Sequence, residues 1–155
     1  MILIKTPSQI DGIRASSKLA AATLKYTASF IKSGISTEFL NQKAHDYIIA
    51  HKAIPAPLNY GGFPKSICTS INNVVCHGIP SKKEILKEGD IVNIDVTTIL
   101  NGYYGDTSAT YPVGKISSEA KLLIERTKKS LDLAIKSVKA GQYLNDCVGK
   151  IIEDY

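Results

Sequence analysis

Residues 92–106 read VNIDVTTILNGYYGD, two β-rich runs that meet at Asn101-Gly102. An Asn-Gly pair between such runs is the strongest short-range signal for a two-residue hairpin turn, because both turn positions require a positive φ. With these two residues in the turn, Leu100 faces Tyr103, and the numbers of every facing pair sum to 203. The sequence therefore predicts an antiparallel hairpin of fixed register.

The same register brings two aspartates together on one face of the hairpin. Asp95 lies opposite Ser108 and Asp106 lies opposite Thr97, so the two carboxylates are diagonal neighbours with backbones roughly 7–8 Å apart. Two like charges placed in this way repel each other unless a cation lies between them, which favours a metal site. The alternative is a polar face that meets water, as one side of an antiparallel sheet often does.

The rest of the chain predicts helices around this hairpin and a strand before it. The predicted helices cover about residues 7–33, 37–52 and 118–139, and a fourth begins near residue 144. Thr6 is the expected N-cap of the first helix, Gln9 completes its capping box, and Gly34 stops it. A strand with a turn at Asn72-Asn73 is expected over residues 66–76. Together with the hairpin, whose first strand alternates between an apolar face and a polar face, these elements predict an α+β fold.

Length and composition are those of one globular domain. The chain has 155 residues, of which 44% are hydrophobic and 21% are charged. Its net charge is +5, but it has only two arginines, Arg14 and Arg126, and its lysines are scattered. We therefore expect a solvated lysine-rich surface and no specific nucleic-acid partner, although a weak attraction to a polyanion such as the ribosome is a second interpretation.

Cysteine usage and the N-terminus favour a cytoplasmic protein. Cys68, Cys76 and Cys147 are odd in number and form no CxxC pair, which argues for reduced thiols. Residues 1–5 lack the basic start of a secretory signal, and no apolar segment reaches the length needed to span a bilayer. No membrane partner is expected.

Three long blocks carry a family resemblance. They are residues 62–66 (GFPKS) leading to Cys68, residues 72–80 (NNVVCHGIP), and residues 89–96 (GDIVNIDV) with 105–108 (GDTS). Through these blocks the chain resembles the type I methionine aminopeptidases, cytosolic metalloenzymes that remove the initiator methionine from new polypeptides. Each block is long, which makes it far more specific than a short motif.

The resemblance implies half of a pita-bread (creatinase/aminopeptidase) fold, with a curved antiparallel sheet and helices on its outer face. Residues 1–155 would form an incomplete catalytic domain, because the family takes three further metal ligands, one histidine and two glutamates, from a second half with a Gly-His-Gly-Ile-Gly stretch. That stretch is absent here. We therefore expect an open sheet edge, an uncovered apolar face and little or no peptidase activity from this chain alone.

The resemblance also assigns roles at the metal site. The residues that match Asp95 and Asp106 hold two divalent ions in the family, with Co, Mn, Fe, Zn and Ni as candidates. His77 matches a histidine that hydrogen-bonds the substrate without binding metal in the resting enzyme. A histidine followed by Gly78 at a strand end can face a cleft. Without the resemblance, a loop histidine that is hydrogen-bonded to water is the simpler interpretation.

Tyr60, Phe63 and Cys68 match residues that line the family's pocket for the methionine side chain. Aromatic rings and a polarizable sulfur suit a thioether, whereas core packing is the alternative for all three. Many relatives have histidine where this chain has Gly61 and glycine where it has Asn59. These departures concern the pocket rim.

The implied substrates are nascent polypeptides that begin with methionine, and the ribosome surface is a candidate partner. A non-catalytic binding module and a degenerate gene fragment are the alternatives to an enzyme. His45 and His51 lie on or at the end of the second predicted helix with no matching ligand nearby. We interpret both as surface or packing residues.

Overall fold

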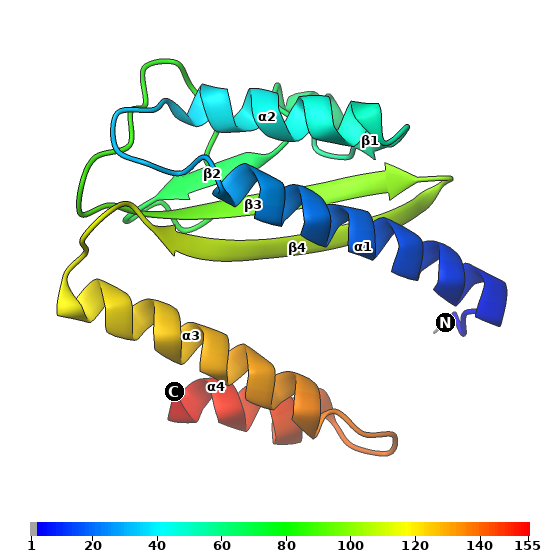
Figure 1. Cartoon of the computed structure of the whole chain (residues 1–155). Coiled ribbons are helices and arrows are strands. Elements are labelled where there is room, and N and C mark those ends of the chain that lie inside the picture. The colour runs from blue at the N-terminus through cyan, green and yellow to red at the C-terminus, as the bar shows by residue number, and fades with distance from the viewer. Residues whose placement is uncertain (1–2) are drawn as a thin grey trace. The chain divides into compact units, whose positions relative to one another are not determined.

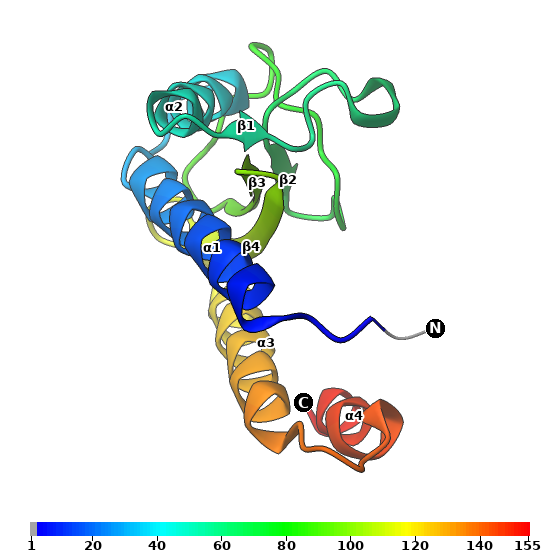
Figure 2. The ribbon, with the colours of Figure 1, turned by 90° about the vertical axis from the view of Figure 1, so that its right-hand side faces the viewer.

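The computed structural model describes residues 3–155. The chain divides into two compact units, Met1–Lys115 and Ile116–Tyr155. The first unit contains a four-stranded antiparallel sheet and the helices α1 and α2, and the second contains α3 and α4 (Figures 1 and 2). The predicted α+β class is confirmed.

Helix α1 (Pro7–Ala28) begins as its sequence predicts. The N–H of Gln9 donates to Oγ1 of Thr6 over 3.3 Å, and the N–H of Thr6 donates to Oε1 of Gln9 over 2.9 Å. Both halves of the capping box are therefore formed, which satisfies N–H groups that the first helical turn leaves free.

The prediction that this helix continues to Ser33 is wrong, because α1 ends at Ala28. Oγ of Ser29 donates to the carbonyl of Tyr26 over 2.6 Å, and the N–H of Phe30 donates to a carbonyl three residues back. A serine that bonds nearby carbonyls and a tightened last turn both end a helix.

Helix α2 (Thr37–Ala50) follows the prediction closely. Its N-cap is Ser36, whose Oγ accepts the N–H of Phe39 over 3.2 Å. The backbone of Lys52 has a φ of +58° just after the helix, so the chain leaves the helical path where expected.

The sheet is built around β3 (Ile91–Leu100). Strand β4 (Tyr103–Pro112) pairs with one side of β3, while β1 (Ile54–Pro55) and β2 (Cys68–Ile71) pair with the other side. Every β3–β4 pair has the predicted register, from Ile91 opposite Pro112 to Leu100 opposite Tyr103. Within residues 3–155, β4 pairs with β3 alone, so the sheet has the open edge that the sequence predicts.

The expected strand over residues 66–76 is only partly correct. Strand β2 covers Cys68–Ile71, and the predicted turn follows it at Asn72-Asn73. Oδ1 of Asn72 accepts the N–H of Ile91 over 3.0 Å, and its backbone has a φ of +50°. This bond directs the chain away from the sheet, so no strand continues to residue 76.

One face of the sheet and the inner faces of α1 and α2 form the core of the first unit. Its buried side chains include Leu19, Ala20 and Leu24 of α1, Leu40, Ala44 and Ile48 of α2, and Val92, Ile94 and Val96 of β3. The apolar face predicted for β3 is therefore the face that the helices cover, as the pattern of alternation requires. Asp95, which alternates with these residues, points away from the core.

Where α1 crosses the sheet, the two backbones lie unusually close. A Cβ at Gly105 of β4 would overlap the backbone of Ser16 and Ser17 in α1. Oγ of Ser16 donates to the carbonyl of Thr98 and Oγ1 of Thr98 donates to the carbonyl of Ser16, both over 3.1 Å. This contact fixes α1 beside the strands that carry the two aspartates.

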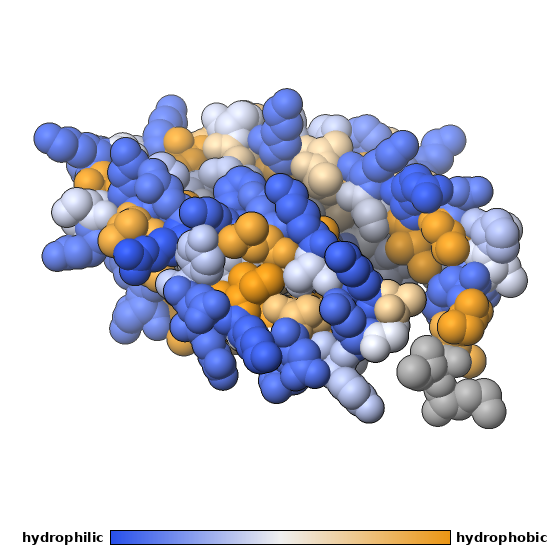
Figure 3. Space-filling model, turned by 90° about the horizontal axis from the view of Figure 1, so that it is seen from below, coloured by the Kyte–Doolittle hydropathy of each residue, from blue (hydrophilic) through white to orange (hydrophobic). Residues whose placement is uncertain are grey.

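The second unit consists of α3 (Ser118–Ser137), a π-helical turn (Asn145–Gly149) and α4 (Lys150–Asp154). These agree with the predicted third and fourth helices to within two residues at α3 and one at the start of the π-helical turn. Many large apolar side chains are exposed on this unit, among them Leu122, Leu123, Leu131, Ile135, Leu144 and Ile152. Figure 3 shows hydrophobic residues gathered among hydrophilic ones on the face seen from below. No helix in the described residues has the length and apolar character that crossing a membrane requires.

Candidate metal and substrate site

A pocket of about 740 Å³ opens beside β3, on the side that Asp95 faces. Its walls come from the loop before β2, from β2 itself, from the segment after Asn73, and from the β3–β4 hairpin. All six residues singled out from the sequence line this pocket: Tyr60, Phe63, Cys68, His77, Asp95 and Asp106. They are brought together from segments up to 46 residues apart; their chemical roles stay predictions.

The two carboxylates lie on the polar face of the hairpin in the predicted diagonal arrangement. Asp95 is opposite Ser108, and Asp106 is opposite Thr97, whose Oγ1 donates to Oδ1 of Asp106 over 3.0 Å. Burial and the neighbouring charge of Asp106 raise the pKa of Asp95 above its ordinary value, and His77 partly opposes this rise. The negative charges therefore repel each other in a partly desolvated position.

His77 reaches the pocket from a strained stretch of backbone. Its φ is +56°, in the left-handed region that histidine adopts more readily than most residues. The next residue, Gly78, lies against β2: its N–H donates to Oγ of Ser70 over 3.2 Å, and its carbonyl accepts the N–H of Thr69 over 2.9 Å. A Cβ at Gly78 would overlap the Thr69 carbonyl. This close approach holds the histidine segment beside the strand that carries Cys68.

The apolar wall consists of two exposed or half-exposed rings and one buried thiol. Tyr60 lies on the short 3-10 turn η1 (Tyr60–Gly62) and is 82% exposed, so core packing does not explain it. Phe63 follows η1 and is half-buried. Cys68 is buried and pairs with Asp95 across β2 and β3. Burial, followed by the charge of Asp95, raises the pKa of the Cys68 thiol to about 11.

The sequence did not single out every residue of the pocket. Thr97, Ile79 and Tyr104 also line it, and Tyr104 is 60% exposed. Tyr104 precedes Asp106 by two positions on the same strand, so strand alternation places both side chains on one face. The two-residue period of the strand could therefore have indicated Tyr104 from the sequence.

His45 and His51 make packing contacts, as predicted. Nδ1 of His45 lies 2.8 Å from Oγ of Ser66, and the ring of His51 stacks on Tyr47 with 4.3 Å between ring centroids. Neither histidine lines the pocket.

The side chains present fit part of a divalent-metal site. Asp95 and Asp106 offer carboxylate oxygens, the donors that suit Mn²⁺, Fe²⁺ and similar ions, and a cation would neutralise the repulsion that raises the pKa of Asp95. Within residues 3–155, no three His, Cys, Asp or Glu side chains form a group that could hold a metal ion. The two aspartates would therefore need further ligands to hold an ion tightly.

Cys68, which lines the pocket, and exposed Cys76 are expected to differ strongly in reactivity. Iodoacetamide should alkylate exposed Cys76 about a hundredfold faster than Cys68 at pH 8, because a thiol with a raised pKa is mostly protonated and burial blocks access. Mass spectrometry of the two cysteine peptides over time measures both rates. In concentrated urea the rates should become equal, and equal rates in the folded chain would contradict the burial of Cys68.

The sequence model of metallopeptidase family M24 matches residues 11–155. The methionine aminopeptidase of Rickettsia prowazekii is 51% identical over 154 residues, which cover 99% of this chain and 59% of the relative. The methionine aminopeptidase of Buchnera aphidicola from Acyrthosiphon pisum is 52% identical over 154 residues, which cover 99% of this chain and 58% of the relative. The chain thus spans less than two thirds of the length of these relatives.

The crystal structure of the methionine aminopeptidase from Rickettsia prowazekii is similar to this chain throughout. The TM-score is 0.94 at 48% identity, and the match covers 99% of this chain and 63% of that chain. The predicted fold, one half of the pita-bread architecture, is therefore confirmed.

Proposed function

The chain belongs to metallopeptidase family M24, and we propose that it forms part of an enzyme that removes the initiator methionine from nascent polypeptides. The observation that carries this proposal is one pocket in which two carboxylates, a histidine and an apolar wall meet. Carboxylates and histidine are groups that hydrolysis uses, and the apolar wall can select a substrate side chain. The alternative, a polar hairpin face that only meets water, does not account for the apolar wall.

Asp95 and Asp106 are the proposed metal ligands of this chain. Two divalent ions, with Co, Mn, Fe, Zn or Ni as candidates, supply hydroxide at neutral pH and polarise a carbonyl when bound in such a site. Oδ1 of Asp106 accepts the Thr97 hydroxyl, which orients this carboxylate toward the pocket. A supporting bond of this kind commonly fixes a metal ligand.

His77 is the proposed hydrogen-bond donor to the substrate. Its ring lies on the same pocket as both carboxylates, and an imidazole can donate to a carbonyl oxygen as negative charge develops there. The left-handed backbone at this residue and the close packing of Gly78 fix the backbone from which the ring extends. A donor on a fixed backbone needs less reorganisation during the reaction.

Tyr60, Phe63 and Cys68 are the proposed contacts of the methionine side chain. Ring edges and a sulfur atom pack well against a thioether, and the buried thiol forms the floor beside Asp95. The proposed place of action is the cytoplasm, where nascent N-termini leave the ribosome. A net charge of +5 would favour a weak approach to ribosomal RNA.

Release of methionine from a Met-Ala peptide tests the proposed function. We expect little or no release by the purified chain with Mn²⁺ or Co²⁺, because two carboxylates leave most of the coordination unfilled. Release should appear when the chain is combined with the segment of the Rickettsia prowazekii relative that lies outside the match.

The control is Asp106→Asn in this chain, which should abolish any release in the combined sample. No release from a properly assembled pair would contradict the proposed function. Release by this chain alone that depends on Asp106 would instead mean that the chain completes its site by self-association.

A further inference from the structure

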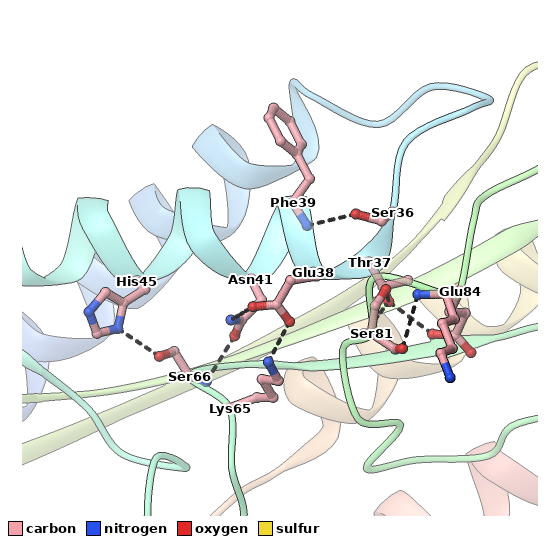
Figure 4. Close-up of polar contacts among 11 residues, drawn as sticks. Ser36, Thr37, Glu38, Phe39, Asn41, His45, Lys65, Ser66, Ser81 and Glu84 are labelled. Atoms are coloured by element: carbon pink, nitrogen blue, oxygen red, sulfur yellow. Dashed lines mark hydrogen bonds and ion pairs between the residues drawn. The ribbon is translucent and has the colours of Figure 1, made fainter.

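Only part of the block at residues 62–66 lines the pocket. Phe63 and Pro64 line the pocket, whereas Lys65 and Ser66 do not. Figure 4 shows where these two residues go: both are held by side chains of α2. The end of the block therefore links the pocket wall to a helix of the core.

Lys65 forms a sheltered ion pair with α2. Its Nζ lies 2.6 Å from Oε2 of Glu38, and the two side chains are only 27% and 17% exposed (Figure 4). Ion pairs on open surfaces contribute little because water and salt screen them. Breaking a sheltered pair leaves one charge without its partner, which is much more costly.

Ser66 is held through both its backbone and its side chain. Its N–H donates to Oδ1 of Asn41 over 2.9 Å, and its Oγ lies 2.8 Å from Nδ1 of His45. Asn41 in turn donates to Oε1 of Glu38 over 3.3 Å. The three α2 residues have the spacing of one helix face, so together with Lys65 and Ser66 they form one unit, which we name the α2 clamp.

The loop in front of the clamp is bonded mainly to itself. The N–H of Asn59 donates to the carbonyl of Phe63 over 2.8 Å, and the N–H of Phe63 donates to the carbonyl of Tyr60 over 2.9 Å. Gly61 and Gly62 have positive φ, and a Cβ on either would meet nothing within 4 Å. In the described structure, the first side-chain attachment of this loop on its C-terminal side is therefore the clamp, which comes before the buried Ile67 and the pairing of Cys68 with β3.

We propose that the α2 clamp positions Phe63 in the pocket wall that it shares with Cys68, and thereby sets how tightly the pocket holds a methionine side chain. Lys65 and Glu38 are positioning residues in this inference, since neither lines the pocket. A wall that is fixed before the ligand arrives spares the ligand the cost of ordering it. The inference rests on the proposed function for the identity of the ligand, but not for the role of the clamp.

The first measurement is the alkylation rate of Cys68 in the full chain without ligand. Lys65→Met should raise this rate about tenfold, because local opening of the wall exposes the buried thiol, while the rate of exposed Cys76 should not change. The double variant Glu38→Lys with Lys65→Glu should restore most of the protection. Lys128→Met, which breaks the exposed pair with Asp132 in the second unit, is the matched control and should have no effect.

The second measurement is the protection of Cys68 by L-methionine amide, with L-alanine amide for comparison. Methionine amide should slow alkylation in the unchanged chain, and Lys65→Met should require several times more of it for the same protection. If the ion pair only stabilised the fold, its loss would not change the concentration of methionine amide needed for protection, after correction for global unfolding measured in urea.

A Cys68 rate within about twofold of the unchanged chain, or a rise matched by the change in global unfolding, would overturn the inference. If Lys65→Met does not fold, Glu38→Gln is judged by the same criteria, because it removes the charge and keeps an oxygen for Asn41. Failure of methionine amide to protect Cys68 in the unchanged chain contradicts the proposed pocket itself. If methionine amide fails to protect Cys68 but Lys65→Met still raises the alkylation rate of Cys68, then the proposed ligand is wrong and the role of the clamp stands.

Discussion

Replacement of Gly105 by alanine is expected to lower the free energy of unfolding by about 3 kcal/mol, the upper range for a group forced into a packed position. A Cβ at this position would overlap the backbone of Ser16 and Ser17, and backbone atoms of a helix cannot move aside as a side chain can. Helix α1 would have to shift away from β4. Urea denaturation followed by circular dichroism measures the change.

Gly102→Ala is the control within the same hairpin. Gly102 has a φ of +81°, but a Cβ there meets nothing within 4 Å, so only the cost of a left-handed alanine, about 1 kcal/mol, is expected. If Gly105→Ala costs no more than Gly102→Ala, then the tight crossing of α1 and β4 is wrong.

The contrast between these two glycines shows which features of the fold a sequence can reveal. Asn101-Gly102 fixes the hairpin register through local turn geometry, and Thr6 with Gln9 fixes the start of α1 through local hydrogen bonds. Gly105 carries no such signal, because its role depends on a helix that lies about ninety positions earlier in the chain. The short β2 likewise depends on Asn72, whose side chain accepts the N–H of distant Ile91. The early end of α1 follows from local bonds of Ser29 and Phe30, which the apolar pattern of the helix does not reveal.

The residues of the candidate site also divide into those that a local signal indicates and those that depend on distant parts of the chain. Asp95 and Asp106 could be paired from register alone, since one hairpin carries both. His77 and Tyr60 reach the pocket from other segments, and only the family resemblance indicated them. Lys65 was part of a recognised block, yet its partner Glu38 lies 27 positions away on a helix face. No period in the sequence connects such a pair.

Asp106→Asn is expected to make the chain more stable without metal and to remove its response to metal. Burial and the charge of Asp106 raise the pKa of Asp95 in the folded chain above its ordinary value of 3.8. Between the ordinary pKa and the raised folded pKa, the folded state therefore binds more protons than the unfolded state. The free energy of unfolding falls as pH rises through this window, and the whole loss is present above the folded pKa. Asparagine removes the charge but can still accept the Thr97 hydroxyl.

Metal reverses this order, because an ion that binds the folded state stabilises it by mass action. Mn²⁺ at a hundred times its dissociation constant would add about 2.7 kcal/mol to the free energy of unfolding of the unchanged chain. Loss of a residue that only supports a metal ligand lowers metal affinity about tenfold to a hundredfold. Asp106→Asn removes a direct ligand, so its loss of affinity should be larger. Urea unfolding at neutral pH, with and without Mn²⁺, measures both effects. Asp132→Asn, on exposed α3, is the control and should leave the Mn²⁺ response unchanged. Equal stabilisation of the unchanged chain and Asp106→Asn would place the bound ion elsewhere and would remove the physical basis for assigning the two hairpin aspartates to metal.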